Sequence, residues 1–127
     1  MKTILVDAVG GIVDGEGNVF REMHGMLERF VNRKIILTNA DYEAANQYKL
    51  NDAPYEVFTL RHEPEKTDPE YFKKMLVHFG FEKDDVVYFE HSEEAARSAG
   101  SIGIKTYHYD ENKKDLVALK KFLMENL

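Results

Sequence analysis

The sequence predicts an α/β fold, a single-domain three-layer α/β/α sandwich around a five-stranded, mainly parallel sheet. Short apolar runs with strand character alternate along the chain with segments of helical periodicity, which is typical of such sheets. The runs are continuously apolar, as expected for strands that are buried on both faces. A length of 127 residues is enough for one hydrophobic core, so residues 1–127 are expected to form one domain.

The first part of the chain predicts a strand, a turn-rich stretch and a helix. Residues 4–6 form a short apolar run. The glycine-rich residues 10–18 contain Asp-Gly and Gly-Asn pairs, which favour a tight hairpin with residues 12–13 and 19–20 as its arms. Over residues 21–31, apolar side chains recur at steps of three, four and one, which predicts a helix.

The middle of the chain continues this alternation. Strands are expected over residues 34–37 and 57–60. Between them, residues 41–50 have a composition typical of a helix. A further helix is expected to begin at Pro69 and to stop at Gly80, because proline suits a first helical turn and glycine suits a helix end.

The last part of the chain predicts two more strands and two more helices. Residues 86–89 form an apolar run, and Ser92 can cap a helix that stops at Gly100. A fifth strand is expected over residues 102–107 and a final helix over residues 115–127.

The composition excludes several classes of protein. A net charge of −6 argues against a nucleic-acid binder, since those proteins carry a basic face. No apolar stretch approaches the ~20 residues of a membrane span. The apolar run before Asp7 is too short for a signal peptide. Cysteine is absent, which removes disulfides and thiolate sites and favours a cytoplasmic location.

Polar side chains stand where the expected strands end, and ligands of parallel α/β sheets bind beyond those ends. Two carboxylates can hold Mg²⁺, and the cation and a lysine can neutralise phosphoryl oxygens. Any one of these residues alone could simply end a strand or cap a turn. Together they predict a phosphate site, made of Asp7, Thr38, Asn39, Lys66 and Glu90.

These residues stand in motifs that resemble those of the haloacid dehalogenase (HAD) superfamily, and the resemblance covers nearly the whole chain. The first family motif, an apolar strand followed by DxDGT, is similar to residues 4–11, and the second, a strand ending in Ser or Thr, to residues 35–39. The third often reads KPDPxxF, and residues 66–72 read KTDPEYF. The fourth, a strand with an acidic end and a helix of small residues, is similar to residues 87–100. The resemblance implies a Rossmann-like, HAD-like sheet.

The resemblance also implies a role for each site residue. Asp7 would be the nucleophile that forms an aspartyl-phosphate. It would also bind Mg²⁺ together with Glu90 and the backbone carbonyl of Val9. Residues 10–18 would form a flap beside the site. The phosphate-binding residues would be Thr38, Asn39 and Lys66, of which Thr38 and Lys66 would hold the phosphoryl group during transfer.

Three positions depart from the family pattern. Val9 stands where the family has the second Asp of DxDGT, its usual general acid/base, whose help is typically worth about 10²–10⁴-fold. Gly11 stands where the family has Thr, and His91 stands where it has a second acidic residue. His91 could replace the missing acid/base, since its ordinary pKa lies near neutrality, or it could be a partly exposed spacer.

Two functions remain open from the sequence. One is a Mg²⁺-dependent phosphatase-type hydrolase that acts through Asp7 on a leaving group that needs no acid, such as an acyl or aryl phosphate. The alternative is a catalytically inactive phosphate-binding or protein-interaction module. A receiver-like phosphoacceptor domain has similar chemistry, but its accepting Asp follows the third strand, whereas Asp7 follows the first.

The length leaves no room for a cap domain, so the site is expected to be open to water. The expected partner is a phosphorylated small molecule or a macromolecular substrate whose own surface covers the site. A homo-oligomer could cover the site instead. Neither a nucleic acid nor a membrane is expected as a partner.

Overall fold

Five parallel strands form one sheet at the centre of the computed structural model, which describes residues 1–127. The order across the sheet is β3-β2-β1-β4-β5, so β1 lies between β2 and β4. The predicted α/β class and the parallel sheet are therefore confirmed. The strands are β1 Thr3–Asp7, β2 Lys34–Thr38, β3 Glu56–Thr59, β4 Val86–Glu90 and β5 Lys105–His108.

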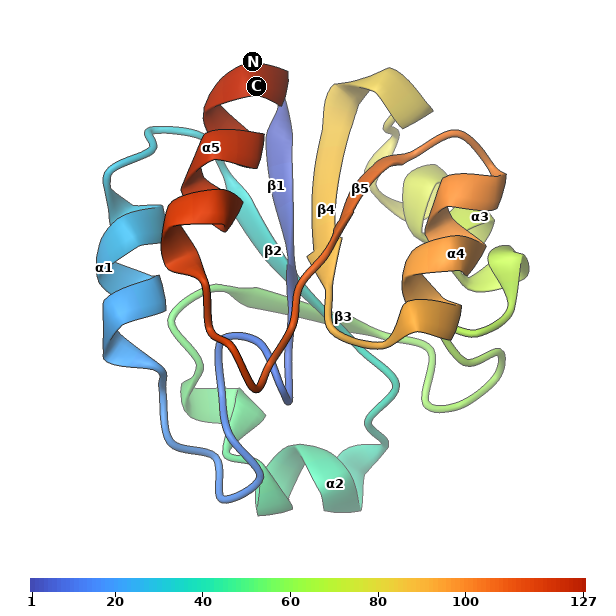
Figure 1. Ribbon diagram of the computed structural model, residues 1–127. Helices are drawn as coiled ribbons and strands as arrows, with labels where there is room; N and C mark the ends of the chain where they lie inside the picture. The colour runs from blue at the N-terminus through green and yellow to red at the C-terminus, as the bar shows by residue number, and fades with distance from the viewer.

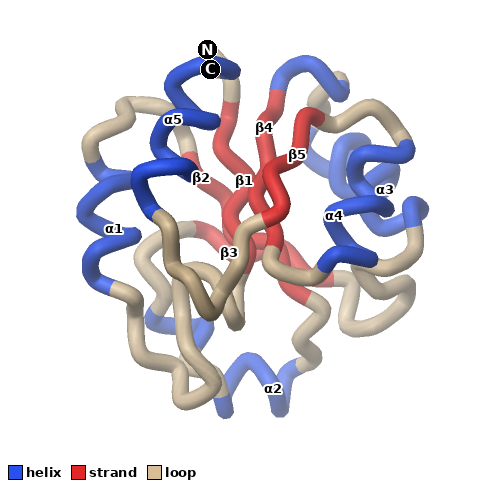
Figure 2. The backbone as a smooth tube through the Cα atoms, in the orientation of Figure 1, coloured by secondary structure: helices blue, strands red, loops and turns tan.

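Helices cover both faces of the sheet and complete the predicted three layers (Figures 1 and 2). Helices α1 and α5 lie on one face and α3 and α4 on the other, whereas α2 lies beyond the carboxyl ends of the strands. The helices are α1 Arg21–Glu28, α2 Tyr42–Gln47, α3 Pro69–Phe79, α4 Glu93–Ser101 and α5 Leu116–Asn126, with short 3₁₀ helices at η1 Leu50–Asp52 and η2 Lys83–Asp85. No helix combines the length and the apolarity that a membrane crossing requires.

The central strands send alternate side chains into two hydrophobic cores. In β1, Ile4 and Val6 join the core that contains Met23 of α1, whereas Leu5 joins the core that contains Phe72 of α3. All five side chains are fully buried. This two-sided burial explains why the strands are continuous apolar runs in the sequence.

The predicted flap, residues 10–18, forms a hairpin together with residues 19–20, and we call residues 10–20 the flap from here on. It lies at the carboxyl end of the sheet, away from both termini (Figure 1). The backbone N–H of Asp14 donates to the carbonyl of Asn18 (3.0 Å), and the N–H of Phe20 donates to the carbonyl of Ile12 (2.8 Å). These bonds bring together the two arms that the turn residues predicted.

Some element boundaries differ from the sequence-based expectation. Helix α1 stops at Glu28, and Val31, predicted on its apolar face, is 84% exposed. Helix α4 continues through Gly100, which was expected to end it. The left-handed residue is instead Gly103, with φ +92°, and β5 begins only after this turn.

Candidate active site

The sheet topology brings the predicted site residues to one edge. Asp7 and Glu90 are the last residues of β1 and β4, and Thr38 is the last residue of β2. These three strands are neighbours, so their carboxyl ends lie side by side. Lys66 reaches the same place from the loop between β3 and α3.

Asp7, Lys66 and Glu90 form one buried ion cluster. The Lys66 ammonium donates to Asp7 Oδ1 (3.0 Å), to Glu90 Oε1 (2.7 Å) and to the carbonyl of Leu37 (3.3 Å). Asp7 and Glu90 are 0% exposed and Lys66 is 7% exposed. The phenol of Tyr88, also buried, donates a short hydrogen bond to Glu90. Little water remains to stabilise these charges, so they depend on one another.

His91 completes the cluster, and its role was the least certain from the sequence. Its Nδ1 lies 2.5 Å from Asp7 Oδ2 and 3.2 Å from Glu90 Oε2, and its backbone N–H also donates to Asp7 Oδ2 (3.0 Å). His91 is therefore not a mere spacer. The only sequence signal for this contact was its position directly after a strand that ends at the site.

The charges in the cluster shift one another's pKa values. Burial raises the pKa of Asp7, and the Lys66 ammonium opposes that shift. Burial also acts to raise the pKa of Glu90, but Lys66 and the other donors outweigh it and hold this pKa well below its usual range. Hydrogen bonds to Asp7 and Glu90 raise the pKa of His91 to about 10. When both carboxylates are ionised, the two cations balance their charge.

The raised pKa of His91 predicts a loss of stability in alkaline solution. The pKa is 6.5 for a free imidazole and about 10 in the fold, so the stabilisation is complete below about pH 6.5 and is lost as the pH rises through 10. Since the side chain is 29% exposed, we expect the contribution to be only about 1–2 kcal/mol. Urea unfolding with EDTA across this range should show a smaller decline for His91→Gln than for the wild type. Parallel declines would contradict the assignment.

A cavity of about 400 Å³ lies over this cluster. Thr38 lines it, and because its hydroxyl accepts from the backbone N–H of Ala40 (3.2 Å), the hydroxyl hydrogen remains free to donate to a ligand. Asn39 also lines the cavity, but its Oδ1 accepts from the backbone N–H of Lys66 (2.7 Å). Asn39 thus holds the loop that carries Lys66.

Gly11 is explained by the path of the flap. The backbone N–H of Ile12 donates to the carbonyl of Asp7 (3.0 Å), which draws the flap onto the end of β1. A Cβ atom at Gly11 would lie 2.4 Å from that same carbonyl oxygen, so no side chain fits there. Threonine at this position would push the flap away from Asp7.

The oxygen donors of the cluster fit a hard divalent cation such as Mg²⁺. Asp7, Glu90 and His91 offer three ligand atoms within 4.8 Å of one another, and the Val9 carbonyl accepts no hydrogen bond. Carboxylate and carbonyl oxygens are donors that Mg²⁺ prefers, whereas an imidazole nitrogen suits transition metals better. A Mg²⁺ ion would therefore require His91 to turn from between the two carboxylates.

Solved structures of HAD-superfamily hydrolases share this fold. A HAD family enzyme from Bacteroides thetaiotaomicron, determined as a magnesium complex, matches with a TM-score of 0.67 at 17% identity, over 94% of this chain and 98% of that chain. A HAD-superfamily hydrolase of subfamily IA from Geobacter sulfurreducens matches with a TM-score of 0.63 at 16% identity, over 86% and 89%. An uncharacterized protein from Corynebacterium glutamicum matches with a TM-score of 0.69 at 19% identity, over 98% and 96%.

Sequence comparison adds no relative, since no protein-family model and no curated protein matches the chain. The chain spans about half (48%) of the UTR4 protein from Saccharomyces cerevisiae, which matches 73% of this chain with a TM-score of 0.58 at 16% identity. At these identities the neighbours establish the fold. The resemblance predicted from the four motifs is confirmed at that level.

Proposed function

We propose that this chain, which has the fold of HAD-superfamily hydrolases, is a phosphatase-type hydrolase that acts through Asp7. One observation carries the proposal: the Asp7 carboxylate lies in a buried cluster with Lys66 and Glu90, directly under an open cavity at the carboxyl edge of the sheet. A purely structural ion pair would not need this position. A phosphoryl group entering the cavity would meet both the carboxylate and the ammonium.

The proposed reaction has two steps. An Asp7 oxygen attacks phosphorus while the bond between phosphorus and the leaving oxygen breaks, and the bonding electrons depart with that oxygen. A water molecule then attacks the phosphorus of the aspartyl-phosphate. The bond to Asp7 breaks, inorganic phosphate leaves, and one proton of the water passes to the departed oxygen or to solvent. Lys66 and the Thr38 hydroxyl would bind the phosphoryl oxygens and neutralise their charge.

Val9 restricts the substrates of this reaction. Its side chain lines the cavity over Asp7 and carries no proton that a departing alkoxide could take. This favours a leaving group that is stable as an anion. Aryl phosphates and acyl phosphates satisfy this condition, and alkyl phosphates do not.

Magnesium is part of the proposal. The charges of Asp7, Glu90, Lys66 and His91 cancel, so a phosphate dianion would enter a cluster without net positive charge. Asp7, Glu90 and the Val9 carbonyl would hold Mg²⁺, which supplies the missing positive charge. The enzyme from Bacteroides thetaiotaomicron was determined with magnesium and, as a mutant, with magnesium and inorganic phosphate.

A second candidate is a phosphate-binding or protein-interaction module without catalysis. Two observations favour it: Val9 replaces the acid/base, and both oxygens of Asp7 are already engaged, one by Lys66 and one by His91. In either case we propose a cytoplasmic protein whose partner is a phosphorylated small molecule or a macromolecule, with the substrate or a second copy of the chain covering the site.

The test is turnover of p-nitrophenyl phosphate and acetyl phosphate with Mg²⁺. We expect the wild type to hydrolyse at least one of them and Asp7→Asn to be slower by about 10³-fold or more, because the amide is not a nucleophile. The matched control is Asp84→Asn, an exposed position in η2. No turnover by the wild type, or equal turnover by Asp7→Asn, would reject the hydrolase. Binding of inorganic phosphate without turnover would then favour the module.

A further inference from the structure

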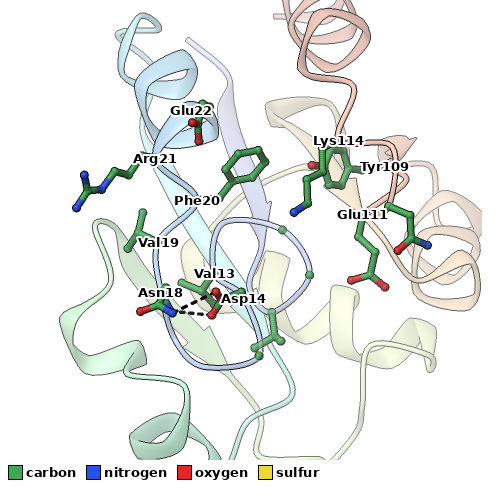
Figure 3. A pocket seen from close by; sticks show the side chains of 15 residues that line it. Val13, Asp14, Asn18, Val19, Phe20, Arg21, Glu22, Tyr109, Glu111 and Lys114 are labelled. Atoms are coloured by element: carbon green, nitrogen blue, oxygen red, sulfur yellow. Dashed lines mark hydrogen bonds between the residues drawn. The ribbon is translucent and has the colours of Figure 1, made fainter.

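A second cavity, larger than the one over Asp7, lies beside the cluster. It has a volume of about 680 Å³ and opens between residues 9–22 and residues 109–114, and we call it the flap cavity (Figure 3). Pockets for small organic ligands commonly measure about 300–1,000 Å³, so it is large enough for an aromatic ring with substituents. Val9 lines both the flap cavity and the cavity over Asp7. The two cavities therefore border each other at Val9.

The hydroxyl of Tyr109 has no hydrogen-bond partner although it is buried. Tyr109 is 1% exposed and lines the flap cavity, and its phenolic oxygen contacts neither protein donors nor protein acceptors. Buried hydroxyls almost always have a partner, because leaving one unpaired costs free energy. The interpretation of Tyr109 as an ordinary core residue leaves this oxygen unexplained. A polar atom of a ligand in the flap cavity would supply the partner.

The other walls of the flap cavity include apolar and aromatic side chains, and two cations, Arg21 and Lys114, also line it. Phe20 and Tyr109 reach into the space from different segments (Figure 3), and Val13 and Val19 line it from the flap. The Lys114 ammonium lies 5.5 Å from the centre of the Phe20 ring. This combination suits an aromatic ring that carries an oxygen-bearing, anionic substituent.

Three acidic side chains line the flap cavity, those of Asp14, Glu22 and Glu111, and two of them have partners. Asp14 accepts from the backbone N–H groups of Glu16 (2.8 Å) and Asn18 (2.9 Å). Glu111 lies against Gly10, with its Oε1 4.0 Å from His91 Nε2. None of the three carboxylates pairs with Lys114, so its ammonium is available to a ligand.

We propose that the flap cavity binds the leaving group of the substrate, and that this leaving group is a phenol with a carboxylate or similar anionic substituent, recognised by Tyr109 and Lys114. The inference rests on the proposed hydrolase and names its substrate class. It also agrees with Val9, because a phenolate departs without an acid. The phosphate would lie over Asp7, and the ring would lie beyond Val9.

The test compares Tyr109→Phe with the wild type, using 4-carboxyphenyl phosphate as the substrate. The variant removes only an oxygen that makes no hydrogen bond, so it is expected to fold as stably as the wild type. We expect its KM to rise about fivefold, the effect of one hydrogen bond, while the KM for acetyl phosphate, which has no ring, stays unchanged. An equal KM for both proteins on 4-carboxyphenyl phosphate would overturn the proposal.

A binding measurement separates this inference from the hydrolase itself. In Asp7→Asn, nuclear magnetic resonance titration with 4-hydroxybenzoate should shift the signals of Phe20 and Tyr109, and the double variant with Tyr109→Phe should bind about fivefold more weakly. If turnover is absent but this binding is present, the hydrolase fails and the cavity assignment stands. If turnover is present and 4-hydroxybenzoate does not bind, or binds both variants equally, the cavity assignment fails.

Discussion

Replacing Val9 by Asp is expected to raise the turnover of alkyl phosphates by about 10²–10⁴-fold, the usual contribution of a general acid/base. Val9 lines the cavity over Asp7 and is only partly buried, so a carboxyl group there would border the reacting atoms without being forced into the core. It could protonate a departing alkoxide in the first step and take a proton from water in the second.

The measurement is a comparison across leaving groups. Turnover of p-nitrophenyl phosphate, which needs no acid to depart, should increase less than turnover of an alkyl phosphate, because only water activation improves for it. The matched control is Val9→Asn, because asparagine has nearly the same shape as aspartic acid but cannot transfer a proton. A gain in Val9→Asn equal to that in Val9→Asp would show that polarity, and not proton transfer, is responsible. No gain on any substrate would favour the non-catalytic module.

The sequence was sufficient to predict which residues meet at the site, because strand ends determine their positions. Asp7, Thr38 and Glu90 each follow an apolar run, and a parallel sheet places all such ends at one edge. Lys66 was placed by the segment KTDPEYF, which resembles the third family motif and follows the third expected strand. These features are local, so a single sequence contains them.

The contacts of His91 and Tyr109 could not be predicted in the same way. Each residue follows a strand end, and segments that are distant in the sequence determine where its side chain points and what surrounds it. His91 turns inward where the flap passes at Gly10, whose missing Cβ leaves room for the ring. The side chain of Tyr109 is buried. That its hydroxyl would lack a partner depends on how the flap folds against the loop after β5.

The boundary of β5 shows a related limit. Residues 102–107 contain an apolar pattern that favours a strand from its first residue. In the structure, Ile102 caps the end of α4, and Gly103, with φ +92°, turns the chain before Ile104 and the start of β5 at Lys105. Both isoleucines still pack into a core. The hydrophobic pattern therefore predicted their burial correctly but predicted their strand conformation incorrectly.

Replacing Lys66 by Met is expected to lower the free energy of unfolding by about 3–5 kcal/mol. The substitution removes the ammonium that pairs with the buried carboxylates of Asp7 and Glu90. The side chains are similar in length, so the main loss is the ammonium and its hydrogen bonds. Urea unfolding at neutral pH measures the effect. Lys73→Met is the matched control: Lys73 pairs with Glu70 at 3.1 Å, but both are exposed, so the expected change is below about 1 kcal/mol.

The double variant Lys66→Met with Glu90→Gln decides how this result is interpreted. Removing the Glu90 charge as well leaves one buried carboxylate that still faces His91, so part of the lost stability should return. If it does not return, the loss comes from packing and not from charge. This separation matters for function, because Lys66 is proposed to bind the phosphoryl group and also neutralises the nucleophile. Turnover of Lys66→Met must therefore be measured without urea, at a temperature at which the variant is shown to be folded. Only then is lost turnover evidence that Lys66 binds the phosphoryl group.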